Sequence, residues 1–505
     1  MLARKVAIGS VLMVSARLIA RLVDLVTMLV LARILVPADF GLVAIAASVV
    51  SIAEAALEIP VNQALVRLSA ITMRQYDTAF TLSALRGLAL TIALPLMAAP
   101  VASFYGEPRL VPLICVLSLA PAARGLISPR LAEFQKAMNF WRDFWLELGG
   151  KLVAFGAGLA IALLTGSYWS IVVGTVVMPV VSSAASYIVA PYRPRLTLAD
   201  LAVFRGFVGW MTAAQIVSAV NWQFERLLLG KVVTTARVGV FTASSDLAGI
   251  PFLAFFGPVL RPLLAGFSHV RDDRDRLAQS YLSSLGAIGA VGLPLLVGES
   301  LVADPAVRLI LGPQWLDAVP LVELLSLSLI PALFALPAVP LIMSFGQTRL
   351  IVYRNLVEFG VKLPLAIVGL LQFGLMGIVA ARLVSELAAV GVSIVLVRRL
   401  AGISASAQVV VCWRSVAASL AMALPVVALR SAMPAPMDAP SAAITLAVLV
   451  ATGAGVYLVT LWLLWLVSGR PAGIEAMLHE TITSLLGRLL GRKGVSSAQQ
   501  HATPP

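Results

Sequence analysis

Long apolar stretches separated by short polar ones run almost without interruption from Val6 to Val467. A helix needs about 20 apolar residues to cross a hydrocarbon core about 30 Å thick. The stretches have this length, whereas a membrane β-barrel would show short segments of alternating polarity. The pattern therefore predicts an all-α polytopic membrane protein.

About fourteen membrane-spanning helices are predicted. Their approximate ranges are 6–31, 40–60, 78–103, 110–127, 146–166, 169–190, 207–229, 238–260, 277–298, 318–344, 351–371, 374–397, 409–430 and 441–467. Composition agrees with this prediction, because 60% of the residues are hydrophobic and only 12% are charged, whereas soluble proteins typically have about 25% charged residues. The mean hydropathy of +0.98 excludes a soluble protein.

The net charge of +13 would suggest a nucleic-acid partner in a soluble domain. Here its distribution favours a simpler explanation, because cytoplasmic loops of membrane proteins collect Lys and Arg. With an even number of helices and a cytoplasmic N-terminus, most of the basic residues fall on the cytoplasmic side. Lys151 and Arg354 are assigned to such cytoplasmic segments. Both termini are therefore expected in the cytoplasm, and no nucleic-acid partner is expected.

An internal repeat is indicated when the chain is aligned with itself at an offset of 198 residues. Helix one then matches helix seven, and helix two matches helix eight. The matched pairs include Arg33 with Lys231, and Gly41 with Gly239. An even number of helices between the copies gives both the same orientation, as in parallel repeats related by an axis along the membrane normal.

The repeat predicts two pseudo-symmetric six-helix lobes with an accessory helix pair. We expect an N-lobe over residues 1–195, a C-lobe over 196–400 and accessory helices thirteen and fourteen over 401–470. Residues 471–505 are expected to form a cytoplasmic amphipathic helix and a disordered tail, because apolar residues recur there at helical spacing before a polar end.

Seven basic residues lie inside the predicted membrane helices, with acidic residues at similar depth. They are Arg17, Arg21, Arg86, Arg124, Arg226, Lys362 and Arg382. Seven such cations facing lipid would cost roughly 20 kcal/mol on the insertion scale. They are therefore expected to face a protein interior or a wet cavity, which indicates a membrane transporter with a charged internal path.

Arg17, Arg21 and Asp24 are spaced by four and three residues, so their side chains share one face of the first helix. Guanidinium groups match phosphate oxygens and stay charged in a cavity. The two arginines are therefore candidate ligands of an anion such as a diphosphate, and Asp24 is assigned to the same candidate substrate-binding site. The alternative is a structural ion pair between Arg21 and Asp24.

Glu358 and Lys362 in helix eleven are four residues apart, and so are Arg382 and Glu386 in helix twelve. Mutually neutralised pairs at this spacing would stabilise the second lobe. Lys362 and Arg382 are also candidate substrate ligands. The two glutamates are alternatively candidate sites for a coupling ion, because buried carboxylates can take up protons or sodium.

The adjacent residues Glu225 and Arg226 point about 100° apart on a helix, so one should face the cavity and the other the lobe interior. We assign Arg226 to substrate binding and Glu225, with Asp246 in helix eight, to possible ion coupling. Glu54 and Glu58 in helix two are further candidate cation sites.

For Arg86 and Arg124 an alternative stays open, a position near the cytoplasmic surface where a long side chain can extend its charged end into water.

A metal or Cys/His centre is not expected. Cys115 and Cys412 lie in apolar helices, and His269, His479 and His501 have no metal-ligand spacing. No phosphate-binding loop is present, so we expect no cofactor and no direct use of ATP. A proton or sodium gradient is the candidate energy source.

Four segments resemble bacterial polysaccharide exporters of the Wzx flippase type, within the multidrug/oligosaccharidyl-lipid/polysaccharide (MATE-like) exporter superfamily. They are LARILVPADFG (31–41), RLAEFQKAMNF (130–140), NWQFERLLLGKVVTTARVGVFTAS (221–244) and LILGPQWLDA (309–318). They are spread over most of residues 1–400. Glu225 departs from the Asp or Asn that is common at its position in these exporters.

This resemblance implies alternating-access export of an undecaprenyl-diphosphate-linked oligosaccharide across the bacterial inner membrane, for surface polysaccharide biosynthesis. Arg17 and Arg21 are similar to first-helix arginines that contact the diphosphate in the related lipid II flippases. The implied partners are this lipid-linked substrate, the membrane lipids and polysaccharide polymerase or assembly proteins. No covalent chemistry is implied, so the chain is not expected to be an enzyme.

Two alternatives stay open. A drug/cation antiporter of the same superfamily would have acids rather than arginines dominating its cavity. A membrane glycan polymerase or ligase would generally need an extended external loop or a carboxylate/His centre, and the predicted outside loops are short and contain no histidine.

Overall fold

The computed structural model describes residues 19–20, 22–59, 61–68, 70–137, 139, 141–205, 210–434 and 438–470. These residues form helices and contain no strand. Eleven helices are long and apolar enough to cross a membrane. This confirms an all-α polytopic membrane protein. Arg17, Arg21 and the predicted C-terminal helix and tail lie outside the described residues.

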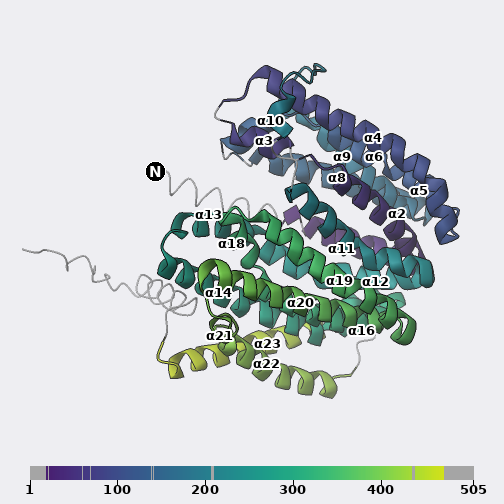
Figure 1. Cartoon of the computed structure of the whole chain (residues 1–505). Coiled ribbons are helices and arrows are strands. Elements are labelled where there is room, and N and C mark those ends of the chain that lie inside the picture. The colour runs from purple at the N-terminus through teal and green to yellow at the C-terminus, as the bar shows by residue number, and fades with distance from the viewer. Residues whose placement is uncertain are drawn as a thin grey trace, which may run out of the picture.

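The first group of helices, shown from purple to blue in Figure 1, is called the N-lobe here. A helix over residues 22–34 precedes it. Its further elements are α2 (Pro37–Ala56), α3 (Val61–Arg67), α4 (Met73–Tyr105), α5 (Leu110–Leu117), α6 (Leu119–Gly125), α7 (Leu131–Lys136), α8 (Trp141–Thr165) and α9 (Trp169–Val189).

The second group, teal to green in Figure 1, is called the C-lobe. The chain reaches it through α10 (Leu201–Arg205), whose Phe204 packs with Val61 and Tyr76 of the N-lobe. The elements of the C-lobe are α11 (Trp210–Val232), α12 (Thr235–Phe256), η1 (Gly257–Val259), α13 (Leu260–Val270), α14 (Arg274–Leu301), α15 (Ala303–Ile310), η2 (Pro313–Ala318), α16 (Val319–Ser328), α17 (Ile330–Ala335), α18 (Ala338–Ser344), α19 (Thr348–Phe373) and α20 (Leu375–Ala401).

An accessory pair follows the C-lobe and lies on its far side from the N-lobe (Figure 1). It consists of α22 (Trp413–Ala432) and α23 (Ala439–Val467), and the short helix α21 (Ala405–Val410) connects it to the C-lobe. Helices α22 and α23 pack against each other and against α14 and α15. The Tyr457 hydroxyl donates a 2.6 Å hydrogen bond to the Ala290 carbonyl of α14, so this pair is attached to the C-lobe.

Several predicted helices differ in their bounds or continuity. The eighth does not end near residue 260, because α12, η1 and α13 continue the helical path to Val270. The fourth is interrupted at Ser118, and the tenth is divided into η2, α16, α17 and α18. Prolines at the starts of η2, α16 and α17 account for divisions within the tenth, since proline lacks the amide that would continue a helix. The total of fourteen spans stays a prediction.

Local sequence signals set the ends of the long helices. Thr72 accepts a hydrogen bond from the Gln75 amide, and the Gln75 side chain accepts one from the Thr72 amide, so α4 begins with a reciprocal capping box. The helix ends at Gly106, whose φ of 70° is the left-handed conformation that glycine adopts without strain. Asp438 and Ser441 make the equivalent cap of α23.

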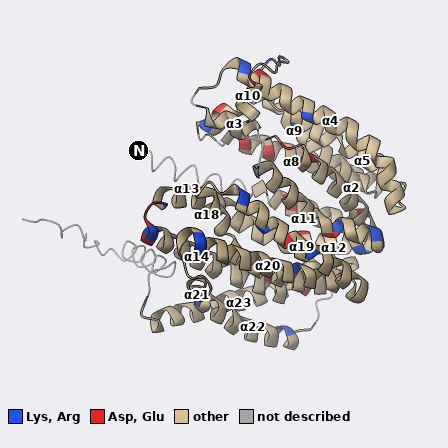
Figure 2. Ribbon diagram, viewed as in Figure 1, with Lys and Arg blue, Asp and Glu red and all other residues tan. Residues whose placement is uncertain are grey.

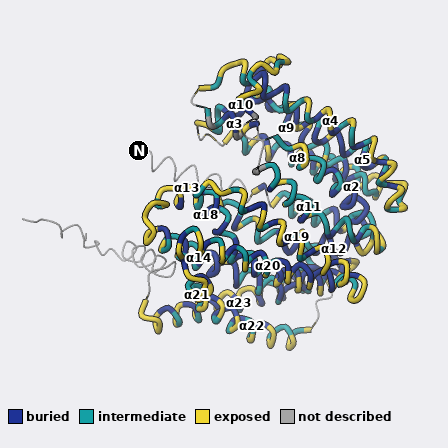
Figure 3. Tube along the Cα trace, in the orientation of Figure 1, coloured by how far each residue is buried: buried dark blue, intermediate teal, exposed yellow. Residues whose placement is uncertain are grey.

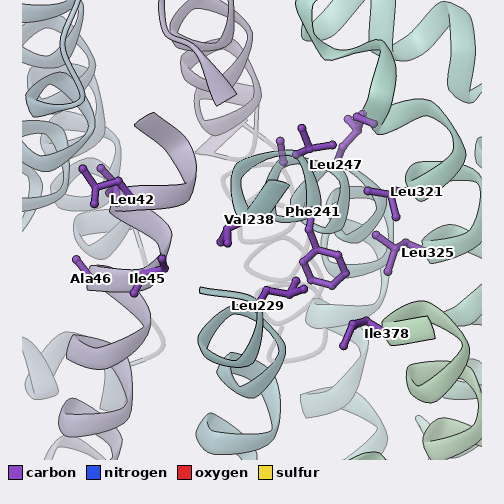
Figure 4. Close-up of a cluster of buried hydrophobic side chains, with 14 of the residues drawn as sticks. Leu42, Ile45, Ala46, Leu229, Val238, Phe241, Leu247, Leu321, Leu325 and Ile378 are labelled. Atoms are coloured by element: carbon purple, nitrogen blue, oxygen red, sulfur yellow. The ribbon is translucent and has the colours of Figure 1, made fainter. Parts of the chain in front are cut away.

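The largest buried apolar cluster crosses between the lobes. Figure 4 shows Ile45 of α2 on the side toward the C-lobe, with Leu42 and Ala46 on the other side of the helix, and the cluster includes Leu229, Phe241, Leu321 and Ile378. Buried positions lie on the inward faces, whereas the outward faces are exposed (Figure 3). Leu164 and Ile188 are among the exposed apolar side chains. Such an apolar exterior is what a lipid environment requires.

The lobes come closest where α2 crosses α12. A Cβ placed on Gly41 would lie 1.8 Å from the Thr235 carbonyl oxygen, and one placed on Gly239 would lie 1.7 Å from the Pro37 carbonyl oxygen. These contacts are reciprocal under the 198-residue offset, since Pro37 corresponds to Thr235 and Gly41 to Gly239. We call this contact the closed end of the molecule.

Candidate functional site: a charged cavity between the lobes

A cavity of about 550 Å³ lies between the N-lobe and the start of α11. The residues that line it are Glu54, Ala55, Glu58, Arg86, Arg124, Gln215, Ser218, Ala219, Trp222 and Gln223. Its N-lobe wall comes from the C-terminal end of α2, from α4 and from α6, and its other wall comes from α11. The cavity is therefore at the opposite end of α2 from the Gly41–Gly239 contact.

Two arginines and two glutamates form the N-lobe wall. Arg124 forms an ion pair with Glu54, and Arg86 forms one with Glu58 and also donates a hydrogen bond of 2.9 Å to the Glu54 carbonyl. The Arg86 Nε atom is buried and has no hydrogen-bond partner among the described residues. The wall thus holds two paired cations with donor capacity left over.

Glu58 lies just beyond the end of α2, and its side chain is 37% exposed. Partial burial raises the pKa of this carboxyl, although the nearby Arg86 guanidinium opposes the rise. Protonation of Glu58 would remove the partner of Arg86. The charge of this wall is therefore adjustable.

Arg86 and Arg124 face a cavity, as expected for charges inside the predicted membrane helices. Both line the interlobe cavity and are held by acids from the neighbouring helix α2. Sequence reasoning placed them by their depth in a predicted helix, which does not show the direction of the side chain. The signal that could have located them was the presence of Glu54 and Glu58, two acids one helical turn apart that need cationic partners.

A second set of charges lies inside the C-lobe, between α11, α19 and α20. Lys362 Nζ lies 3.6 Å from Glu225 Oε1 and 3.7 Å from Glu358 Oε1. Arg382 Nη1 lies 3.6 Å from Glu225 Oε2, and Arg354 Nη1 lies 3.7 Å from Glu358 Oε2. We call this set the buried network. Figure 2 shows charged residues in the helices of this region.

The buried network brings together several predicted site residues. Glu225, Glu358, Lys362 and Arg382 each expose less than a tenth of their surface. The predicted pair of Glu358 with Lys362 is confirmed. The predicted ion pair of Arg382 with Glu386 is not formed, because Arg382 is turned toward Glu225 on α11 and donates a 3.1 Å hydrogen bond to Ser245 of α12.

Paired burial explains why these charges are tolerated. An isolated ion in a low-dielectric interior costs several kcal/mol, and partners of opposite charge offset that cost. Asn221 also donates a hydrogen bond to Glu358. In this conformation, Lys362 and Arg382 are compensated by carboxylates and are not among the lining residues of the cavity. Their predicted role in substrate binding stays a prediction.

The buried network contacts the cavity wall at two points. Arg354 donates a 3.1 Å hydrogen bond to the Asn355 side-chain oxygen, and the Asn355 side-chain amide donates one of 2.8 Å to Ser218, which lines the cavity. The Arg382 guanidinium carbon lies 5.8 Å from the ring centre of Trp222, another lining residue. A change in the cavity wall can therefore reach the network through side chains of α11.

The other predicted residues pair elsewhere. Arg226 forms an ion pair with Asp246 across α11 and α12, so these two predicted residues meet, while the adjacent Glu225 points into the C-lobe interior. Asp24 accepts hydrogen bonds of 2.8 and 2.7 Å from Lys151 Nζ.

Lys151 and Arg354, which were expected in cytoplasmic segments, lie inside long helices. Lys151 lies inside α8 and Arg354 inside α19, and only 13% of each side chain is exposed. Both were counted as loop residues because they are near the predicted helix starts. The observed helices begin earlier, at Trp141 and Thr348, which places these cations within the bundle.

Two of the segments that resemble exporter motifs meet at the closed end. Trp315 and Gln314 donate hydrogen bonds of 2.9 and 2.7 Å to the Ala32 carbonyl, and Arg33 donates one of 2.7 Å to the Leu309 carbonyl. The rings of Phe40 and Trp315 make an edge contact with centres 5.1 Å apart. These motifs therefore join the first helix and α2 to the C-lobe.

Two helical lobes with a charged cavity between them define the molecule as a polytopic membrane protein of the transporter type. Residues 30–320 match the family described as "Polysaccharide biosynthesis protein". The match extends over more than half of the chain, so the chain belongs to this family.

Curated relatives agree with the family. The chain is 23% identical to the lipopolysaccharide biosynthesis protein WzxC of Escherichia coli K12, over 70% of this chain and 73% of WzxC. It is 27% identical to the succinoglycan biosynthesis transport protein ExoT of Rhizobium meliloti, over 60% of this chain and 62% of ExoT.

Solved structures agree with the two-lobe fold. The lipid II flippase MurJ in an inward closed conformation has a TM-score of 0.72 at 14% identity, with 90% of this chain and 99% of that chain covered. An inward-facing multidrug resistance MATE transporter has a TM-score of 0.60 at 15% identity, with 77% and 98% covered. At these identities the likeness concerns the fold alone.

Proposed function

We propose that this protein is a flippase that moves a lipid-linked oligosaccharide, of the undecaprenyl-diphosphate type, across the bacterial inner membrane for surface polysaccharide biosynthesis. The observation that carries the proposal is the pair Arg86 and Arg124 in a cavity between two lobes whose outer faces are apolar. A diphosphate needs cations, and arginine forks bind phosphate oxygens in partly desolvated sites.

The transport cycle uses the two ends of α2. The lobes are in contact at Gly41 and Gly239 and separate around the cavity near Glu54. Rocking of the lobes would open the closed end and close the cavity end, so that the head group is exposed first to one side and then to the other. The lipid tail stays in the bilayer throughout. The reaction needs no covalent step, so we propose that the protein is a transporter and not an enzyme.

The basic loops set the proposed orientation. Arg193 and Arg195 after α9, and Arg271 and Arg276 before and in α14, lie at the cavity end of the bundle, which we assign to the cytoplasm by the positive-inside rule. The substrate would then enter from the cytoplasmic leaflet and leave in the periplasmic one. Both termini are placed in the cytoplasm, and polysaccharide polymerase or assembly proteins are the proposed partners.

We propose that Arg17 and Arg21, which precede residues 22–34 in the sequence, complete the anion path. The energy source is a proton or sodium gradient in this proposal, with Glu225, Asp246, Glu358 and Glu386 as candidate coupling groups. Glu225 and Glu358 are the stronger pair, because both belong to the buried network that contacts the cavity wall.

The drug/cation antiporter is the second candidate. It is favoured by Glu54 and Glu58, which place as many acids as arginines in the cavity. The two functions make opposite demands on this wall. A cationic drug needs the carboxylates, whereas a diphosphate needs Arg86 and Arg124.

Leaflet orientation of lipid-linked repeat units separates these functions. Cells lacking this protein are complemented with wild type, with Arg86→Gln/Arg124→Gln, or with Arg109→Gln. The last variant is a matched control, because Arg109 also pairs with a glutamate, Glu107, at 2.7 Å, but in the loop between α4 and α5.

If the proposal is right, repeat units accumulate facing the cytoplasm without the protein, and only wild type and the control restore their export. Full rescue by the double variant would contradict the role of the two arginines. Normal export with unpolymerised units would instead identify an assembly enzyme. Drug sensitivity with unchanged surface glycan would favour the antiporter.

A further inference from the structure

A second cavity, of about 660 Å³, lies in the N-lobe near the ends of α4 and α9 and is separate from the interlobe cavity. Its lining residues are Met73, Asp77, Arg130, Tyr187, Pro191, Tyr192, Arg193 and Arg195. We call it the interfacial pocket. It adjoins the ends of two membrane spans, since α4 begins at Met73 and α9 ends at Val189.

The charge available in this pocket is positive. Its single acid, Asp77, is 7% exposed and accepts a 2.6 Å hydrogen bond from the Tyr192 hydroxyl. Arg130 is engaged by Glu133 and by the Pro191 carbonyl. Arg193 and Arg195 are exposed, and among the described residues neither forms an ion pair or a side-chain hydrogen bond. Two guanidinium groups are thus available to a ligand.

Hydrogen bonds and prolines hold the wall of the pocket in place. The Ser128 hydroxyl donates a 2.8 Å hydrogen bond to the Ala190 carbonyl, at the start of the segment that leads to the two arginines. The bond of Tyr192 to Asp77 ties the same segment to α4. Prolines at 191 and 194 restrict its backbone further. Preorganisation of this kind lowers the cost of binding.

The surroundings of the pocket are those of a membrane surface. Leu196, directly after Arg195, exposes 77% of its surface, and Met73 in the pocket wall is also exposed. Trp141 and Trp145 are exposed at the start of α8, which packs antiparallel to α9 and therefore begins at the same end. Tryptophan is enriched where protein meets the head-group region. Figure 2 shows basic residues at this end, near α3 and α10.

We propose that the interfacial pocket binds the phosphate head group of an anionic membrane lipid, with Arg193 and Arg195 as its ligands. Basic pockets at the end of a helical bundle recognise lipid phosphates in this way. The exposed apolar residues beside the arginines would contact the acyl chains, which a soluble phosphate lacks. The proposal does not depend on what the interlobe cavity transports.

The experiment uses the full-length protein in detergent, titrated with phosphatidylglycerol or with phosphatidylcholine, and follows thermal stability and lipid retention in native mass spectra. The test variant is Arg193→Ala/Arg195→Ala. The matched control is Arg274→Ala/Arg276→Ala, which removes two exposed arginines from the same end of the molecule outside the pocket. A parallel titration with glycerol 3-phosphate tests a soluble source of the same chemistry.

We expect wild type and control to bind phosphatidylglycerol in preference to phosphatidylcholine. The test variant should bind phosphatidylglycerol roughly 30-fold more weakly, which is what two basic residues at a lipid surface contribute. Equal weakening in both double variants would overturn the proposal, because it would indicate non-specific surface charge. Equal stabilisation by glycerol 3-phosphate would overturn the assignment to a lipid, and so would the absence of any effect of phosphatidylglycerol on wild type.

Discussion

Gly41 and Gly239 are 198 residues apart in sequence, yet each packs against the backbone next to the other, and each would place a Cβ within 2 Å of a carbonyl oxygen of the opposite helix. Only glycine allows two helices to approach this closely. The contact is reciprocal, so the repeat detected in the sequence is present at the centre of the interface between the lobes. The closed end therefore requires glycine, which has no side chain, at both positions.

The first prediction concerns this contact. Gly239→Ala should separate α2 from α12, because the Cβ would meet the Pro37 backbone, which cannot yield as a side chain can. Overpacking of this kind costs about 2 kcal/mol, so the closed-end conformation should become roughly 30-fold less populated. Spin labels at positions 109 and 237, in a background without cysteine, would show longer distances.

Gly249→Ala is the control for this prediction, since it lies on the same helix and a Cβ there would meet nothing within 4 Å. Unchanged distances in Gly239→Ala would show that the two helices can shift without opening the closed end.

The second prediction concerns Trp315, whose Nε1–H donates a hydrogen bond to the Ala32 carbonyl. Trp315→Phe removes this donor but keeps an aromatic ring near Phe40. The buried carbonyl would keep its bond from Gln314, so the expected loss is about 1 kcal/mol of closed-end stability. The same spin-label distances measure the change. Trp315→Ala should open the closed end further, because it also removes the ring contact with Phe40. If both variants have the same effect, the whole contribution of Trp315 comes from the hydrogen bond.

The third prediction concerns Lys362, which is buried between Glu225 and Glu358. Lys362→Met should destabilise the protein by about 3 kcal/mol, because removing one partner leaves buried carboxylates with insufficient compensation. Thermal unfolding in detergent measures this loss. Lys362→Met/Glu225→Gln should recover part of it, since the second change removes the excess negative charge. No recovery would indicate that Lys362 acts through packing rather than through charge.

The fourth prediction concerns the pH dependence of anion binding in the interlobe cavity. The pKa of Glu58 is raised above its usual value of 4.5 by burial, with Arg86, Arg124 and Glu54 as its charged neighbours. Below the raised pKa this carboxyl is neutral and releases Arg86, so the affinity for inorganic diphosphate should increase as the pH falls through this raised pKa. Calorimetric titration at several pH values measures it.

Glu58→Gln should flatten this pH profile at the high-affinity level. The raised pKa of Glu58 also affects the stability of the fold, because the folded state holds the proton more tightly than the unfolded state. The contribution of Glu58 to stability is therefore present below pH 4.5 and is lost as the pH rises through the raised pKa. A pH profile that is unchanged in Glu58→Gln would assign the titration to another group.

Parts of the site could be predicted because they are local. The pair of Glu358 with Lys362 follows from spacing on one helix, and the membrane spans follow from apolar length alone. The pairing of Arg382 could not be obtained this way. Its spacing to Glu386 is the same four residues, although in the less favourable order, and the structure turns it toward Glu225 on α11.

By itself, the sequence determined that this chain crosses a membrane many times, that its halves repeat, and that its interior carries charge, because each of these follows from periodicity and from the cost of placing ions in lipid. The tertiary structure alone decided which charges line a cavity and which neutralise one another. Arg86 and Arg124 face the space between the lobes, whereas Lys362 and Arg382 are enclosed by carboxylates. The physical reason is that the rotation of each helix about its axis, and the neighbour it meets, depend on packing between segments far apart in the chain.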